Sequence, residues 1–218
     1  MPFNQVAQNE ALKSGTGGGV SGAITHIGVF TTAAEPGTGT NSTGTEATGG
    51  SPAYARQAVT WGTAASGQLT NTNALTFDVP AGTYGYLSYH NASAGNTNNY
   101  RGYGPINGTV KGFGTVDSAG VTANAIQSAA HGYANTDRVT VYNVFAESLP
   151  GGLTEGTLYF VVGATTDTFQ VSLTSGGAAV DITSIGELFH QKAIPETFAS
   201  QGQITVAAGQ ITLDATAM

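Results

Sequence analysis

The stretch QKAIPETFASQGQITVAAGQITLDA, residues 191–215, decides how the rest of the chain is organised. It returns to the light, Thr-rich composition of the first hundred residues after a middle portion of different character. Its two short strand patterns, 203–206 and 210–213, are too small to form a core alone. We therefore expect them to pair with strands from the N-terminal half.

The portion between these two parts begins at about residue 109 and has its own strand patterns and turns, at 138–144, 157–163, 169–174 and 179–182. Loop-closure entropy grows slowly with loop length, so a whole module inserted in a loop is tolerated. We predict an outer domain of residues 1–108 plus 193–218 and an inserted small β-domain of residues 109–192.

The N-terminal half supplies the other strands of the outer domain. Asn4 and Gly15 have the residue types that begin and end a short helix, and residues 31–50 lack large apolar side chains, which predicts a long surface loop. We predict an all-β fold: an antiparallel, jelly-roll-like β-sandwich with a short N-terminal helix and an inserted small β-barrel-like domain. The expected strands of this half are 23–30, 54–63, 69–79, 83–90 and 100–106.

Composition narrows the function. Only 9% of the 218 residues are charged, Lys and Arg number 6, and the formal net charge is −7. Phosphate affinity comes mainly from Lys and Arg, so we expect neither a nucleic-acid nor a membrane partner. Cysteine is absent, which excludes disulfides and thiolate metal sites. We recognise no signal peptide and no spanning helix, and we expect a soluble product made in a cytoplasm.

The strand pattern within GGSPAYARQAVTWGTAASG, residues 49–67, holds one Trp and one Arg. Alternation places Trp61 and Arg56 on opposite faces. We predict that Trp61 is a core residue. Arg56 either pairs across an interface or covers its own sheet.

No catalytic, cofactor or metal site is predicted. The chain has no G-x-S-x-G motif, and His26, His90, His131 and His190 are far apart in sequence, without zinc-ligand spacing. We expect these histidines to be structural or at the surface. Carboxylates are more often turn and cap residues than metal ligands, so no metal and no cofactor is expected.

The segment TYGYLSYHNASAGNTNNYRGYGPI, residues 83–106, is the candidate interface or glycan surface. Clustered tyrosine rings can stack on sugars or anchor a protein interface. They can equally pair across the strands of a hairpin, and the sequence leaves both readings open. The residues concerned are Tyr84, Tyr86, Tyr100, Arg101 and Tyr103.

The segment TEATGGSPAYARQAVTWGTAASGQLTNTNALTFDVPAGT, residues 45–83, closely resembles a family of small tailed-bacteriophage virion proteins, labelled tail fibre or minor tail proteins. Residues 195–198 and the closing ITVAAGQITLDA match the same pattern. The inserted portion resembles a second module of phage fibre proteins. After the PAGT turn the chain departs from the family, because TYGYLSYHNASAG replaces its usual apolar strand.

The resemblance implies a non-enzymatic structural protein of a tailed-phage virion, an accessory of the decoration or fibre type outside the capsid or tail. The implied partners are major capsid or tail proteins of the same virion and further copies of the chain, with a trimer as the first expectation by analogy. The alternative is a host-receptor or glycan-binding module of the tail, acting through the tyrosine surface.

Overall fold

The computed structural model describes residues 24–32, 36–37, 39–63, 65, 68–108, 112–144 and 147–214. The predicted N-terminal helix, between Asn4 and Gly15, lies outside the described residues. The chain divides into two compact units. The outer unit contains Met1–Gly104 and Glu196–Met218, and the barrel unit contains Pro105–Pro195. The change of composition along the sequence predicts these junctions at residues 109 and 192.

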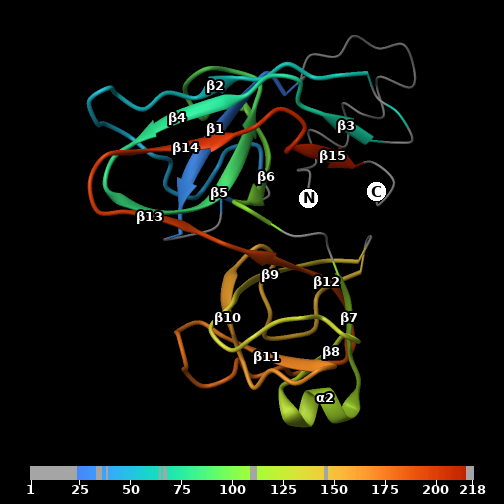
Figure 1. Ribbon diagram of the computed structural model, residues 1–218. Helices are drawn as coiled ribbons and strands as arrows, with labels where there is room; N and C mark the ends of the chain where they lie inside the picture. The colour runs from blue at the N-terminus through green and yellow to red at the C-terminus, as the bar shows by residue number, and fades with distance from the viewer. Residues whose placement is uncertain are drawn as a thin grey trace. The chain divides into compact units, whose positions relative to one another are not determined.

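The described part of the outer unit is built from strands (Figure 1). A five-stranded sheet has the order β13-β5-β1-β2, with β6 also paired to β5, and two further two-stranded sheets pair β14 with β4 and β15 with β3. The strands are β1 (His26–Thr31), β2 (Gln57–Ala58), β3 (Gln68–Thr70), β4 (Leu75–Val79), β5 (Gly82–His90), β6 (Tyr100–Pro105), β13 (Glu196–Phe198), β14 (Gly202–Val206) and β15 (Thr212–Asp214).

The C-terminal strands pair with the N-terminal half, as the sequence predicts. Strand β13 pairs antiparallel with β5, β14 with β4 and β15 with β3. In the β14–β4 pair Ile204 lies opposite Phe77, and both side chains are buried. The last strands therefore complete the outer unit, and the barrel unit is inserted between β6 and β13.

Strand β5 is the centre of the large sheet. Every residue from Tyr84 to His90 is buried, so both faces of the strand are covered. It is also paired on both edges, with β1 and with β13. In a strand that is covered on both faces, the side chains at odd and at even positions all lie in the interior. Most of those side chains in β5 are aromatic.

An ion pair made by a buried arginine explains the Arg of the motif YARQ. Arg56 Nε and Nη2 donate to the two oxygens of Glu46, each at 2.7 Å, and the Arg56 side chain is 3% exposed. Arg56 also donates to the carbonyls of Ala92 and Gly95 at 3.2 and 2.8 Å. The Tyr54 hydroxyl donates to Glu46 and accepts from the Val29 amide, both at 2.9 Å. Arg56 thus neither pairs across an interface nor covers its own sheet. Its side chain instead links three segments within the outer unit.

This network also corrects two sequence predictions. The expected strand 54–63 is reduced to β2, and beyond it Trp61 forms only an isolated antiparallel bridge with Asn71. Trp61 is only partly buried, and its indole Nε1 donates to the Ile24 carbonyl at 2.7 Å. Part of the predicted surface loop 31–50 pairs with β1, since the Ala47 amide donates to the Val29 carbonyl at 2.9 Å and Ala47 is buried.

The barrel unit is a closed antiparallel barrel with strand order β10-β11-β8-β7-β12-β9, which confirms the predicted barrel-like domain (Figure 1). Strands β7, β8 and β12 have no counterpart among the expected strands, and the expected strand 179–182 is irregular. Asp117 caps α2 by accepting from the Gly120 amide at 2.7 Å. The elements are β7 (Gly112–Val116), α2 (Ser118–Ala123), β8 (Ile126–Gln127), β9 (Arg138–Tyr142), β10 (Leu158–Val162), β11 (Thr168–Ser172) and β12 (Gly186–Ala193).

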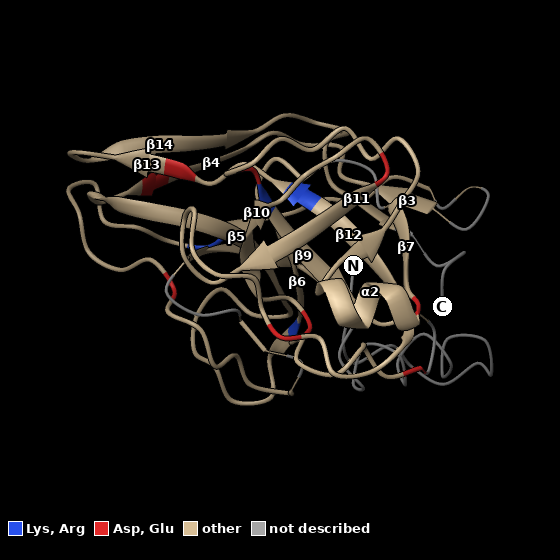
Figure 2. Ribbon diagram, turned by 90° about the horizontal axis from the view of Figure 1, so that it is seen from below, with Lys and Arg blue, Asp and Glu red and all other residues tan. Residues whose placement is uncertain are grey.

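The barrel closes around a cluster of apolar side chains from all six strands. Closure pairs the strands with one another, so the barrel has no open sheet edge. Figure 2 shows how sparsely charged residues are spread along the described chain. Among the described residues no helix is long and apolar enough to cross a bilayer. The buried cluster consists of Val116, Ile126, Val139, Val141, Tyr159, Val161, Phe169, Val171, Ile182 and Leu188.

Candidate functional site

The five residues predicted to form an interface or glycan surface are all buried, so that prediction is wrong. Tyr84, Tyr86, Tyr100 and Tyr103 are at most 2% exposed, and Arg101 is 3% exposed. The physical reason is the central place of β5 and β6, whose described residues from Tyr84 to His90 and from Tyr100 to Pro105 are covered on both faces. No ring of this group is presented to a ligand outside the unit.

The same residues have structural contacts instead. The rings of Tyr86 and Tyr103 meet edge to face with centroids 5.7 Å apart, which is the hairpin-type pairing that the sequence left open. Tyr84 donates its hydroxyl to the Pro80 carbonyl at 3.0 Å, and Tyr100 donates to the Gly37 carbonyl at 2.7 Å. Arg101 Nη1 donates to the carbonyls of Asn98 and Tyr100, both at 2.9 Å.

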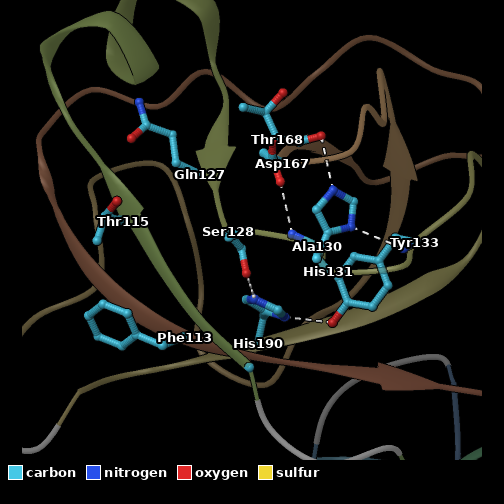
Figure 3. Close-up of a pocket in the computed structure, with 12 residues that line it drawn as sticks. Phe113, Thr115, Gln127, Ser128, Ala130, His131, Tyr133, Asp167, Thr168 and His190 are labelled. Carbon is cyan, nitrogen blue, oxygen red and sulfur yellow. Dashed lines mark hydrogen bonds between the residues drawn. The ribbon is translucent and has the colours of Figure 1, made fainter.

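A pocket in the barrel unit is the best candidate for a functional site. Its volume is about 830 Å³. It lies against β7 and β8 and against the loops that follow β8 and precede β11 (Figure 3). Its lining residues are Gly112, Phe113, Thr115, Gln127, Ser128, Ala129, Ala130, His131, Tyr133, Asp167, Thr168 and His190.

His190, on β12, is the centre of the polar contacts in this pocket. Its Nε2 lies 2.9 Å from the Ser128 hydroxyl oxygen, and its Nδ1 lies 2.6 Å from the Tyr133 hydroxyl oxygen. The side chain is buried, and burial lowers its pKa to about 4. His190 is therefore neutral at pH 7 and has one N–H donor and one acceptor nitrogen.

Two hydroxyl groups hold the His190 ring in place. Burial raises the pKa of Tyr133, which keeps this phenol protonated. Neutral His190 carries its proton on one of its two ring nitrogens, and a hydroxyl group that can donate or accept faces each of them. The Ser128–His190–Tyr133 chain therefore satisfies either tautomer of the ring.

Aromatic packing fixes the same ring. Tyr133 and Phe169 lie edge to face with His190, at centroid distances of 5.3 and 5.2 Å. His131 contacts Tyr133 and Phe169 at 5.0 Å each. Gly112 passes over the His190 ring so closely that a Cβ there would collide with it. The floor of the pocket is therefore rigid.

The groups at the mouth of the pocket are of a different kind. Phe113 is a large apolar side chain that is 47% exposed. Asp167 is exposed, and its Oδ1 accepts from the Ala130 amide at 3.0 Å. No group of three His, Cys, Asp or Glu side chains in the described part of the chain is placed to hold a metal ion. The mouth combines an apolar ring, hydroxyl groups and one carboxylate.

Sequence reasoning missed this pocket because its parts are distant in the chain. The short separation of His131 and Tyr133 in the sequence was the local signal. His190 had no such signal, and only closure of the barrel brings β12 beside β7. His131 and His190, which are far apart in the sequence, thus belong to one aromatic cluster.

Comparisons of the chain with protein families, with characterised proteins and with solved structures found no match.

Proposed function

We propose that the chain is a non-enzymatic structural protein of a tailed-phage virion, an accessory of the decoration or fibre type on the exterior of the capsid or tail. Its partners are major capsid or tail proteins of the same virion. The proposal starts from the resemblance of residues 45–83 and of the closing strands to small virion proteins.

The observation that carries the proposal is the pairing of the C-terminal strands with the N-terminal half. Strands β14 and β4 contain two of the matching segments, and they form one antiparallel pair. The segments that carry the resemblance are therefore neighbours in one unit. The low charged fraction of 9% supports the same role, because a surface covered by neighbouring proteins gains little from charge.

The proposal includes the arrangement of the sheets in the outer unit and the oligomeric state of the chain. The sheets of the outer unit stack as a jelly-roll-like sandwich, and the chain assembles as a trimer. Repetition over symmetric copies supplies avidity that a single modest contact lacks. Light scattering of the purified chain tests the assembly, with a mass of three chains expected and a monomer at micromolar concentration contradicting it.

The location is tested on purified virions of the phage that encodes the chain. We expect mass spectrometry to detect the chain in the particles, and we expect gold-labelled antibodies to decorate the capsid or the tail at a fixed position. A chain that is abundant in infected cells but missing from purified particles would overturn the proposal. Turnover of cell-wall polymer by the purified chain would overturn its non-enzymatic part.

The alternative, a glycan-binding module, loses the surface on which it was based, because the tyrosines are buried. The barrel pocket offers it a different location.

A further inference from the structure

We propose that the pocket of the barrel unit binds a neutral saccharide unit. The inference rests on the pocket alone and holds wherever the chain acts, so it goes beyond the virion role proposed above.

The apolar part of the recognition is Phe113. Phe113 lines the pocket and is 47% exposed, although large apolar side chains are usually buried. The ring meets Phe189 edge to face, with centroids 6.0 Å apart and an interplanar angle of 71°, so its orientation is fixed. An exposed and oriented aromatic face suits the C–H face of a sugar ring, which is a flat apolar surface bordered by hydroxyl groups.

The polar part consists of hydroxyl groups and a carboxylate. The Ser128 hydroxyl oxygen lies 2.9 Å from His190 Nε2, and a hydroxyl group that makes one such contact keeps further hydrogen-bonding capacity for a ligand hydroxyl. Asp167 uses Oδ1 to accept from Ala130, and its exposed carboxylate has further acceptor capacity for ligand hydroxyls. Donors and acceptors beside an apolar ring match the alternating groups of a saccharide.

Charge distinguishes a neutral ligand from an anionic one. No Lys or Arg lines the pocket, and Asp167 contributes a negative charge. His190 adds no positive charge at pH 7, because burial lowers its pKa to about 4. A phosphate or a uronic acid therefore meets repulsion without a cation to offset it.

Size and rigidity agree with this ligand class. The volume of about 830 Å³ lies in the range of small-molecule sites and exceeds what one hexose needs. The contacts of His190 with Ser128 and Tyr133 fix the pocket floor before any ligand arrives. A preformed site loses little ordering entropy on binding.

The test is an NMR titration of the ¹⁵N-labelled full chain with glucose, galactose, mannose and N-acetylglucosamine. We expect saturable shifts at the amides of 112–115 and 128–131 with at least one of these sugars, at a dissociation constant of about 1 mM or above. Glucuronic acid should bind more weakly than glucose. No saturable shift with any neutral sugar, or shifts confined to the outer unit, would overturn the proposal.

Two variants and two matched controls identify the site. We expect Phe113→Ala to weaken binding about tenfold and Asp167→Asn to weaken it severalfold, while the Asn oxygen can still accept from Ala130. Leu173→Ala and Asp181→Asn change exposed residues of the same unit outside the pocket and should leave affinity unchanged. Because Asp167→Asn changes no buried side chain, it keeps the test decisive if Phe113→Ala unfolds the barrel. Unchanged binding in a folded pocket variant, or tighter binding of glucuronic acid, contradicts the inference.

Discussion

The outer unit and the barrel unit bury different kinds of side chain. Arg56 and Arg101 are buried in the outer unit, whereas Arg138 and Lys192 of the barrel unit remain partly exposed. The buried guanidinium groups donate to loop carbonyls such as those of Ala92 and Asn98. The barrel core is instead an apolar cluster rich in valine.

The difference shows what makes a buried charge tolerable. A guanidinium has five N–H donors, and each needs an acceptor when water is excluded. Loops between short strands leave carbonyls unpaired, and the outer unit uses them for this purpose. In a closed barrel most strand carbonyls are paired with neighbouring strands. Arg138 donates to one of them, the Leu158 carbonyl at 2.7 Å, but its side chain remains partly exposed.

The largest expected effect comes from truncating one aromatic residue in each core. Phe169→Ala in the barrel unit and Phe77→Ala in the outer unit each remove a fully buried ring, and each should lower the free energy of unfolding of its own unit by about 4 kcal/mol. Trp61 is the only Trp of the chain and belongs to the outer unit, so its fluorescence reports on that unit. Hydrogen exchange of barrel amides reports on the other.

The two variants also test whether the outer unit and the barrel unit unfold independently. We expect Phe169→Ala to leave the urea midpoint of the Trp61 signal unchanged. An equal shift of both signals in both variants would mean that the units unfold as one, and each would then no longer have its own stability.

The next effect concerns the ion pair between Arg56, whose side chain is 3% exposed, and Glu46, whose side chain is 22% exposed. Arg56→Ala leaves the Glu46 carboxylate without the cation that binds both its oxygens, and we expect a loss of about 3 kcal/mol in the outer unit by urea unfolding. Arg56→Lys retains the charge but not the two-pronged geometry, so its loss should be intermediate. A loss below about 1 kcal/mol for Arg56→Ala would show that this pair stabilises the unit no more than an exposed ion pair does.

Acid should weaken both units through one buried histidine in each. Burial, and then the nearby Arg56 charge, lowers the pKa of His90 to about 3, and burial lowers the pKa of His190 to about 4. The unfolded chain takes up a proton below about pH 6.5 and the native histidine does not, so stability is complete above that pH and falls as the pH decreases. We expect a loss of about 2 kcal/mol per unit by pH 4.5.

The two histidines differ in where this loss ends. The loss from His190 should end near pH 4 and that from His90 near pH 3, measured as the urea stability of each unit against pH. A His190→Phe variant should flatten the profile of the barrel unit and leave the Trp61 profile unchanged. If His190→Phe leaves the barrel profile as steep as before, the histidine is not the source of the acid sensitivity.

The smallest effect is expected for the ion pair of the barrel unit. Lys192 Nζ lies 2.6 Å from Asp137 Oδ2, but the two side chains are 27% and 21% exposed. Lys192→Ala should cost less than about 1 kcal/mol, and added salt should reduce the difference from the unsubstituted chain. A cost equal to that of Arg56→Ala would show that burial does not separate the two pairs.

The sequence by itself determined the strand-rich class, the insertion and the return of the C-terminal strands. These follow from patterns within short segments, such as the alternation in 203–206, and from a change of composition along the chain. Such patterns indicate which side chains will be buried. They do not indicate which other segment of the chain will pack against them.

The tertiary structure alone decided where polar and aromatic side chains lie. Tyr86 and Tyr103 looked suited to a surface, but β5 and β6 are covered on both faces, so the rings became core. Arg56 forms an ion pair with Glu46, and His190 contacts Ser128 because the barrel closes. Burial and partner choice depend on contacts between segments distant in sequence, which local periodicity does not encode.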